Sequence, residues 1–198
     1  DAKEESVNTI LEMAEYKKTG TCKILIVTGC MAQRYKEEIT EEIPEVDAVL
    51  GTTSYGDIVK ALNEAEAGHV FREFKDINAL PEDSGRRVIT TGGHFGYLKI
   101  AEGCDKHCTY CIIPSLRGKF RSVPEERLLK QAEYMASQGV RELILVAQET
   151  TVYGTDLYGK KTLHILLKKL CQIKGIRWIR VLYCYPEEIY DELIQVMK

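Results

Sequence analysis

The chain has 198 residues, a formal net charge of −3, and hydrophobic and charged fractions of 44% and 29%, ordinary values for a soluble globular protein. The slightly acidic balance argues against nucleic-acid binding through a broad basic surface, and no apolar stretch approaches the ~20 residues of a membrane span. The cysteine count of seven is odd and no signal peptide is visible, so we expect free thiols, a cytoplasmic location and no membrane partner.

Residues 1–68 alternate between helical and strand-like patterns, which predicts a small doubly wound α/β domain. Compact apolar runs mark its strands, the first of them expected to be buried on both faces. The predicted elements are a helix ended by Gly20, a strand at 23–27, a helix at 31–42 stopped by Pro44, a strand at 47–51 and a helix at 55–68.

Residues 69–95 interrupt this rhythm. Proline, serine and glycine cluster there without helical periodicity, so we predict a linker, with one strand at 70–74.

Residues 96–198 resume a regular alternation of strand and helix. Right-handed strand–helix units repeated in this way build a parallel barrel, so we predict the first half of a (β/α) partial barrel. The predicted elements are a strand at 97–101, a helix from Pro124 to Gly139, a strand at 142–147, a polar loop at 148–161, a helix at 163–170, a strand at 178–182 and a helix at 186–198.

In such a barrel the functional groups collect at the carboxyl ends of the strands. Three strand ends carry unusual polar residues, at 103–111, 148–151 and 183–185, and parallel pairing brings them to one rim. From this position we expect Gln148 and Tyr110 to contact a cofactor. Tyr110 has two interpretations, stacking on a flat ligand ring or filling the mouth of the barrel as an ordinary aromatic residue.

The loop at 103–111 places Cys104, Cys108 and Cys111 at C-x3-C-x2-C spacing directly after a predicted strand. Three thiolates in one loop fit a cubane iron–sulfur cluster that leaves one iron without a protein ligand. An iron with an open position binds and activates small molecules, so this motif points to an enzyme.

A zinc site is the alternative that the same loop leaves open. Three cysteines with His107 would complete four ligands, but His107 and Cys108 are neighbours whose side chains diverge. His94 would have to reach back across a strand. No second cysteine pair follows at zinc-finger spacing, so the cluster is the favoured interpretation.

Cys30 directly follows the first predicted strand, at the amino end of a helix. That position exposes a thiol and lowers its pKa, as a metal ligand requires, although a small buried residue at a strand end is the commoner interpretation. The remaining cysteines have no ligand-like neighbours. Cys22 and Cys171 are expected as core or near-surface thiols, and Cys184 is a weaker candidate because it lies on the rim.

Four stretches closely resemble the radical S-adenosylmethionine (SAM) methylthiotransferases. Residues 102–118, with the three cysteines followed by Ile112-Ile113-Pro114 and Arg117-Gly118, carry the likeness together with Thr28-Gly29-Cys30-Met31. The stretches at 146–158 and 180–186 look like the RimO branch, which modifies an aspartate of a small-subunit ribosomal protein. The tRNA-modifying MiaB branch usually differs at 148–151 and ends its third strand with a Ser-His-Pro-like sequence.

This resemblance implies a mechanism and its cofactors. Cys104, Cys108 and Cys111 would hold a 4Fe–4S cluster whose open iron chelates SAM, and one-electron reduction would cleave SAM to a 5′-deoxyadenosyl radical. The radical would remove a hydrogen from the β-carbon of the target aspartate. A second, auxiliary 4Fe–4S cluster, with Cys30 as one ligand, would deliver sulfur, and another SAM would supply the methyl group. The implied partners are the ribosomal protein and a reductant protein.

The resemblance also predicts that parts of the family's chain are missing. The other two auxiliary-cluster cysteines would precede residue 1, so residues 1–68 are expected as a truncated auxiliary-cluster domain. The chain of 198 residues is expected to be inactive by itself. Glu149 stands where aspartate is more usual. Two alternatives remain open, a tRNA adenosine methylthiotransferase with the same chemistry, and a metal-binding module without enzymatic activity.

Overall fold

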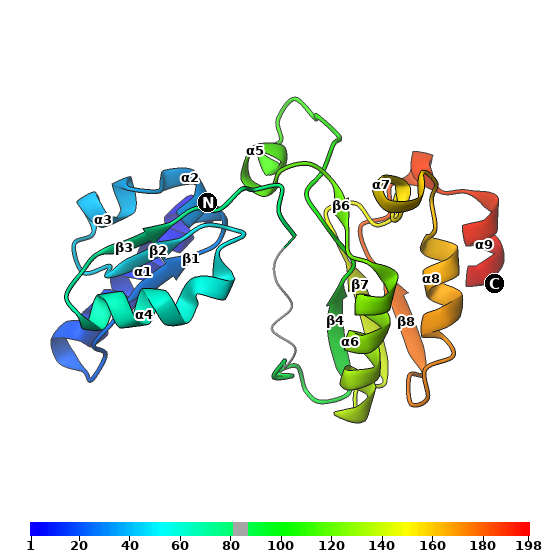
Figure 1. Cartoon of the computed structure of the whole chain (residues 1–198), viewed down its shortest axis with the longest axis horizontal. Helices are drawn as coiled ribbons and strands as arrows, with labels where there is room; N and C mark the ends of the chain where they lie inside the picture. Colours follow the sequence, from blue (N-terminus) through cyan, green and yellow to red (C-terminus); the bar gives the residue numbers. More distant parts are fainter. Residues whose placement is uncertain (81–86) are drawn as a thin grey trace. The chain divides into compact units, whose positions relative to one another are not determined.

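The computed structural model describes residues 1–80 and 87–198, and its contacts divide the chain into two compact units. The first unit comprises Asp1–Asp83 with Ser115–Arg117, and the second comprises Ser84–Pro114 with Gly118–Lys198. Residues 81–86, which belong to the stretch predicted as a linker, lie outside the described residues (Figure 1).

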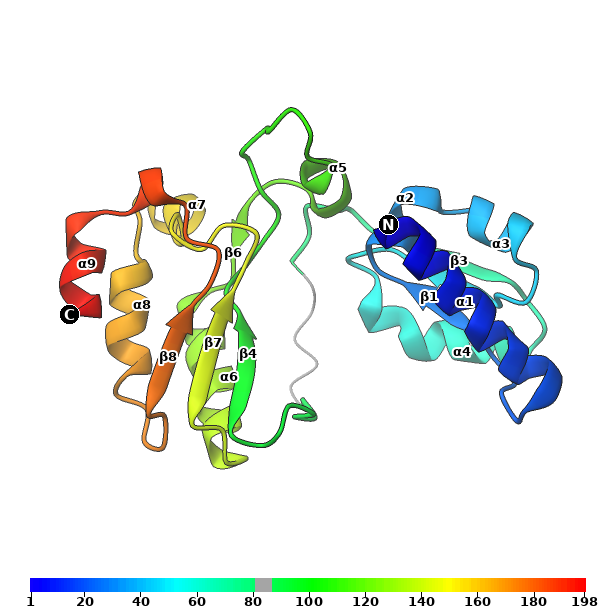
Figure 2. The ribbon, with the colours of Figure 1, turned by 180° about the vertical axis from the view of Figure 1, so that it is seen from behind.

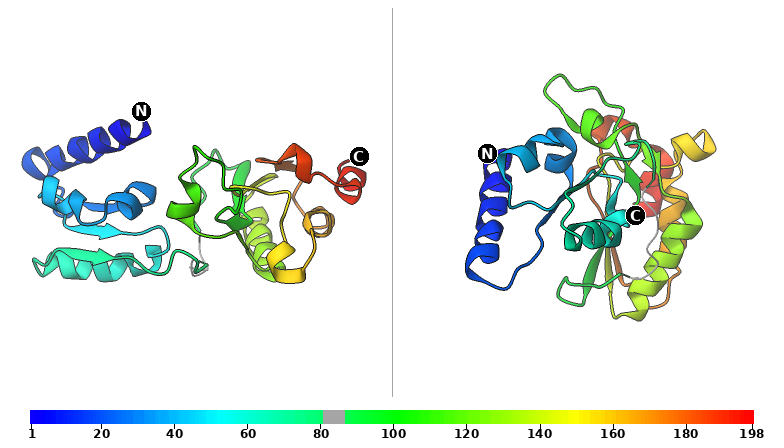
Figure 3. Two further views of the ribbon diagram at one scale, coloured as in Figure 1. Left: turned by 90° about the horizontal axis from the view of Figure 1, so that it is seen from above. Right: turned by 60° about the vertical axis from the view of Figure 1, so that its left-hand side comes forward.

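The first unit is a three-stranded parallel sheet with helices packed against it. Its elements in chain order are α1 (Ala2–Thr19), β1 (Ile26–Thr28), α2 (Cys30–Tyr35), α3 (Glu38–Glu42), β2 (Ala48–Leu50), the 3-10 helix η1 (Tyr55–Asp57), α4 (Ile58–Glu66) and β3 (Phe71–Glu73). The strands lie side by side in the order β1-β2-β3, and all neighbours run parallel. Helices α1 and α4 lie on opposite sides of this sheet (Figure 3, left).

Helix α1 is held against the sheet by a narrow apolar face and by one partly buried ion pair. Ile10 and Ala14, four residues apart on one face, are its only fully buried residues. Near its end, Lys17 Nζ lies 2.6 Å from Asp47 Oδ2, and the same oxygen accepts a 2.7 Å hydrogen bond from the Leu25 N–H. The carboxylate of Asp47 therefore joins the helix to the segment that leads into β1.

Two predictions for the first unit need correction. Strand β1 begins at Ile26 rather than at residue 23, and only Val27 is buried in it, because β1 is an edge strand while the central β2 is buried throughout. The single helix predicted at 31–42 is wrong. The N–H of Lys36 still bonds Ala32 O at 2.9 Å, but Lys36 has φ +40, which turns the chain out of α2 before α3 begins. The strand expected near 70–74 is present as β3.

The second unit contains a three-stranded parallel sheet, a short two-stranded ribbon and helices. Its elements in chain order are β4 (Phe95–Lys99), β5 (Ala101–Glu102), α5 (Ile113–Arg117, whose last three residues group with the first unit), β6 (Arg121–Ser122), α6 (Glu125–Ser137), β7 (Glu142–Val146), α7 (Thr155–Tyr158), α8 (Leu163–Leu170), β8 (Trp178–Val181), the 3-10 helix η2 (Pro186–Glu188) and α9 (Asp191–Met197). The main sheet has the parallel order β4-β7-β8, and β5 pairs antiparallel with β6.

One face of the main sheet forms the core of this unit. Leu98, Leu143 and Leu145 are fully buried on that face, and helices α6 and α8 cover it (Figure 1). Gly96 lets α6 approach closely, because a Cβ at this position would lie 2.5 Å from Cε of Met135. The periodicity of 2 along each strand thus sends alternate residues into the helical layer.

The other face of the sheet carries larger and more polar side chains, and in Figure 2 it is turned toward the viewer with α6 behind it. Tyr97 pairs in register with Ile144 and Arg180 across the three strands. Tyr97 is 41% and Trp178 is 64% exposed on this side. These parallel strands with their helices on one side are the arrangement expected for part of a (β/α) barrel.

Several predicted elements of the second unit are subdivided. The strand expected at 97–101 ends at Lys99, and the chain then forms β5. At the junction, the N–H of Ile100 bonds Val146 O beyond the end of β7, while the carbonyl of Ile100 accepts a bond from Val123 N–H after β6. The polar loop at 148–161 contains the one-turn helix α7, and the last predicted helix is divided into η2 and α9. Among residues 1–80 and 87–198, no helix combines the length and apolarity needed to cross a bilayer.

Candidate metal centre and active-site rim

The cysteine loop leaves the sheet at a glycine whose conformation and lack of a side chain are both required. Gly103 has φ +75, and a Cβ at this position would lie 2.1 Å from Lys119 O and 2.5 Å from Gly118 O. The next residue, Cys104, donates a 3.2 Å backbone hydrogen bond to Gly118 O. The start and the end of the loop are therefore held together, and the three cysteines lie on the closed loop between them.

The three thiols lie half-buried in this loop. Cys104 Sγ accepts a 3.4 Å hydrogen bond from the Lys106 N–H, and the Cys111 N–H bonds Cys108 O at 2.9 Å, which closes a turn between these two cysteines. Backbone N–H groups directed at sulfur stabilise thiolate ligands and tune an iron–sulfur cluster. The donor set, three partly accessible thiols in one loop, fits a cluster with three protein ligands.

Within the described part of the chain, no three or more His, Cys, Asp or Glu side chains group closely enough to hold one metal ion. A tetrahedral zinc site needs all its ligands around one ion, whereas in a cubane each thiolate binds a different iron. The assignment of Cys104, Cys108 and Cys111 as cluster ligands stays a prediction.

The loops that follow β7 and β8 are joined by buried threonines. Thr150 is fully buried, its hydroxyl donates to Leu182 O at 2.8 Å, and its N–H bonds Tyr183 O at 3.2 Å. Tyr183 has φ +59, an uncommon conformation for a residue with a side chain, and the bonds from Thr150 hold it there. The Thr151 hydroxyl accepts a 3.0 Å bond from the Tyr185 N–H. Two of the three predicted strand ends therefore meet as one rigid rim.

A cavity of about 340 Å³ lies between the cysteine loop and this rim. Cys104 and Lys106 contribute from the loop, while Glu149, Lys161 and Glu188 contribute from the other side. Glu149 is 3% exposed, and its carboxylate accepts hydrogen bonds from both the N–H and the hydroxyl of Thr151. The third strand end is thus brought to the other two, as the parallel topology predicts.

Glu188 carries two ion pairs at the edge of this cavity. Lys106 Nζ pairs with Glu188 Oε1, and Lys161 Nζ lies 2.8 Å from Oε2. The hydrogen bond from Lys106, followed by that from Lys161, lowers the pKa of Glu188 to about 2. The hydrogen bond to Glu188 in turn raises the pKa of Lys106. Glu188 and Lys106 are therefore both charged at neutral pH.

The two residues expected to contact a cofactor have different environments. Tyr110 is 90% exposed, so it does not fill the mouth of the barrel, and its ring is accessible to a ligand. Gln148 follows β7 and is half-buried. Its Oε1 atom is shielded from solvent and has no hydrogen-bond partner among the described residues. A bound ligand could donate the hydrogen bond that this oxygen lacks. Both roles stay predictions.

Cys30 is exposed at the first residue of α2, in the first unit. This is the accessible position that a metal ligand needs, and it differs from the buried position that the commoner interpretation predicts. Residues Ser115–Arg117 belong to the same unit, and Arg117 Nε lies 3.2 Å from Cys30 Sγ.

The other cysteines are in ordinary positions. Cys22 Sγ contacts Ile24 O at 3.5 Å, and Cys171 is exposed at the end of α8. Cys184 is half-buried on the rim, 3.5 Å from the Thr150 hydroxyl. None of these contacts resembles a metal site.

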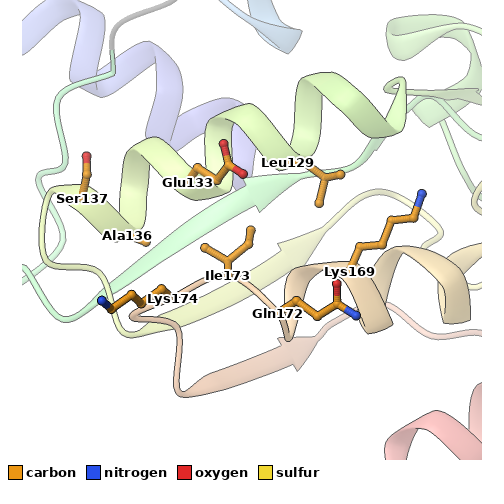
Figure 4. A pocket seen from close by; sticks show the side chains of 8 residues that line it. All are labelled: Leu129, Glu133, Ala136, Ser137, Lys169, Gln172, Ile173 and Lys174. Atoms are coloured by element: carbon orange, nitrogen blue, oxygen red, sulfur yellow. The ribbon is translucent and has the colours of Figure 1, made fainter.

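A second hollow, of about 590 Å³, lies between α6 and the end of α8 on the helical side of the second unit (Figure 4). Figure 4 shows Leu129 and Glu133 on α6, Ile173 in the turn that follows α8, and Lys169 on the last turn of α8. Lys169 pairs with Glu125 of α6. The residues that line this groove include no cysteine and no residue of the rim.

The family of the chain follows from a family model. Residues 98–198, more than half of the chain, match the model described as the radical SAM superfamily. The chain belongs to this superfamily. Membership of this superfamily implies the use of SAM and of an iron–sulfur cluster. Residues 1–51 match a second model, described as Uncharacterized protein family UPF0004.

Curated relatives are similar over the whole chain. The chain is 66% identical to the ribosomal protein uS12 methylthiotransferase RimO of Lachnoclostridium phytofermentans. It is 55% and 53% identical to proteins of the same name from Clostridium botulinum and Clostridioides difficile. These alignments include 100%, 98% and 100% of this chain but only 45%, 44% and 44% of the relatives. The chain therefore spans less than half the length of these relatives.

A solved structure has a similar fold. The radical S-adenosylmethionine methyltransferase TsrM of Kitasatospora setae, which contains cobalamin and a 4Fe–4S cluster, matches with a TM-score of 0.61 over 94% of this chain and 41% of its own. The sequence identity is 11%, so this likeness concerns the fold alone.

Sequence reasoning identified the cysteine loop but missed the charged groups around it. Lys106 lies inside the motif, yet nothing in the spacing shows that its partner is Glu188 in η2. Asp156 was also missed. Its carboxylate accepts bonds from the N–H and the hydroxyl of Ser122, at 2.8 and 2.6 Å, and fixes the strand β6 that closes the cysteine loop.

Proposed function

We propose that this chain is part of a radical SAM methylthiotransferase that adds a methylthio group to ribosomal protein uS12, at the β-carbon of an aspartate. Two findings together carry the proposal. The cysteine loop lies on the rim of a partial barrel, and the chain is 53–66% identical to proteins named for this activity. The target aspartate and the whole reaction remain proposals, because the chain spans less than half of those relatives.

Cys104, Cys108 and Cys111 would hold a 4Fe–4S cluster, and its open iron supplies a binding position for SAM and the electron that cleaves it. The protein's own contribution is positioning. The Lys106 N–H orients the Cys104 sulfur, Gly103 closes the loop, and the fixed rim surrounds the adjoining cavity. We assign Gln148 Oε1 and the exposed ring of Tyr110 to contacts with SAM, because one lacks a partner and the other is free to stack.

We assign residues 1–68 to part of an auxiliary-cluster domain and residues 96–198 to part of a radical SAM domain, joined by a linker at 69–95. Cys30 would be one ligand of a second 4Fe–4S cluster. Its exposed thiol and the neighbouring Arg117 side chain support this role. Among the described residues, no group of three His, Cys, Asp or Glu side chains suited to a metal ion includes Cys30. A cytoplasmic reductant protein would supply the electrons.

The test is a substrate comparison with the full-length protein that contains this chain. Reconstituted enzyme is incubated with SAM, a reductant and either uS12 or tRNA, and mass spectrometry measures methylthio addition. The proposal expects a mass gain of one methylthio group on the uS12 aspartate peptide and none on tRNA. Modification of tRNA adenosine alone would assign the protein to the other branch. Binding of zinc without iron or sulfide would make it a metal-binding module.

A further inference from the structure

The segment between Cys104 and Cys108 is attached to the rim by a charged bridge that the proposed function leaves unexplained. Lys106 extends from the middle of this segment, and its ammonium group pairs with Glu188. The second carboxylate oxygen of Glu188 pairs with Lys161 at 2.8 Å, and Lys161 also donates to the carbonyl oxygen of Glu188 at 2.8 Å. Glu188 therefore links the cysteine loop to η2 and to the loop before α8.

The geometry of this bridge is restricted more than that of an ordinary surface ion pair. The side chains of Lys106, Lys161 and Glu188 are 30%, 29% and 26% exposed. Exposed ion pairs contribute little because their side chains are flexible and solvated. Here both oxygens of one carboxylate are occupied, and the charges are partly shielded, so the positions of the two lysines are fixed together.

The bridge is also anchored to the buried part of the rim. Lys106 Nζ lies 4.4 Å from the centre of the Tyr185 ring, a distance typical of a cation–π contact. The N–H of Tyr185 bonds the buried Thr151 hydroxyl at 3.0 Å, and that hydroxyl bonds Glu149. A contact made by the cysteine loop is thereby carried into a network that cannot move without breaking buried hydrogen bonds.

We propose that Glu188 is a positioning residue for the cysteine loop. By holding Lys106, it keeps the segment between Cys104 and Cys108 against the rim in the geometry that accepts the iron–sulfur cluster. It also offsets one of the two positive charges that the lysines bring to the cluster's edge. This inference rests on the proposed function only in requiring that the loop holds a cluster.

The test measures how fast reconstituted full-length protein releases iron to a ferrous chelator under anaerobic conditions. Glu188→Gln is expected to release iron about tenfold faster than the wild type, because a charged hydrogen bond to the loop is lost. Glu187→Gln is the matched control, since Glu187 is an exposed neighbour in the same 3-10 helix. A Glu188→Gln rate equal to that of Glu187→Gln would overturn the inference.

Lys106→Met provides an independent variant that changes only a partly exposed side chain. It should release iron as fast as Glu188→Gln, and the double variant should be no faster than either single one, because both remove the same contact. Effects that multiply in the double variant would show two separate roles and would contradict the proposal. If Glu188→Gln does not fold, Lys106→Met carries the test, and an unchanged rate refutes the bridge.

The midpoint potential of the cluster separates charge positioning from general loosening. Removing the negative Glu188 should raise the potential, whereas removing the positive Lys106 should lower it. Shifts in the same direction would contradict the bridge. None of these measurements uses the substrate. Wild-type protein that shows all of them but leaves uS12 unmodified would refute the proposed function alone, and an active enzyme insensitive to Glu188→Gln would refute this inference alone.

Discussion

Replacement of Gly103 by alanine should destabilise the cysteine loop, because this glycine combines a positive φ with a close backbone contact. An alanine there must adopt φ +75, which costs about 1–2 kcal/mol relative to an ordinary conformation. Its Cβ would also lie 2.1 Å from Lys119 O, and real Cβ atoms essentially never approach other atoms within 3.0 Å. The backbone must therefore move, which adds about 1–3 kcal/mol of overpacking strain.

Gly159→Ala is the control that isolates the second cost. Gly159 has φ +69 at the end of α7, but nothing lies within 4 Å of its added Cβ. We expect urea unfolding, followed by circular dichroism, to give a free-energy loss of about 2–5 kcal/mol for Gly103→Ala and about 1–2 kcal/mol for Gly159→Ala. Iron bound after reconstitution should fall only in Gly103→Ala. Equal stability losses and equal iron contents would refute the role assigned to this close contact.

Three further predictions concern the rim and its supports. Thr150→Val should lower the free energy of unfolding by about 1–3 kcal/mol, because the partly buried Leu182 carbonyl loses its 2.8 Å partner; urea unfolding against the wild type checks this. Asp156→Asn should cost a similar amount, about 1–3 kcal/mol, since an amide has one acceptor oxygen for the two Ser122 donors; an unchanged urea midpoint would contradict it. The folded-state pKa of Glu188 is lowered to about 2 by its two lysines, so its contribution is complete above the ordinary value of 4.5 and is lost as pH falls towards 2. The difference in unfolding free energy between wild type and Glu188→Gln should therefore be constant from pH 5 to 7. It should shrink progressively as the pH falls below 4.5.

The sequence identified the parts of this molecule whose signals are local. The three cysteines are adjacent in one loop, and the parallel strand–helix rhythm implies that this loop shares a rim with the ends of β7 and β8. In each case the decisive contacts join residues close in sequence or strands whose order is set by topology. The exposure of Cys30, in contrast, differs from the buried position that its place at a strand end favoured.

The features that the sequence did not predict depend on tertiary contacts. The pairing of Lys106 with Glu188 needs two side chains far apart in sequence to meet, and the chain offers 27 lysines and arginines and 30 acidic residues as possible partners. The left-handed conformation of Tyr183 is imposed by Thr150 from another strand end. No proline or glycine stands at Lys36, where the chain breaks between α2 and α3. The periodicity of the surrounding residues therefore predicted one helix instead of two.

Electron paramagnetic resonance of the reduced full-length protein, recorded before and after addition of SAM, tests most directly whether three sulfurs on this rim leave an iron open. We predict a 4Fe–4S signal that SAM alters in the wild type. That component should be lost in a Cys108→Ala variant and kept in a Cys171→Ala variant, whose thiol is exposed away from the rim. A wild-type signal that SAM leaves unchanged, or a SAM-sensitive signal that survives loss of Cys108, would contradict the account.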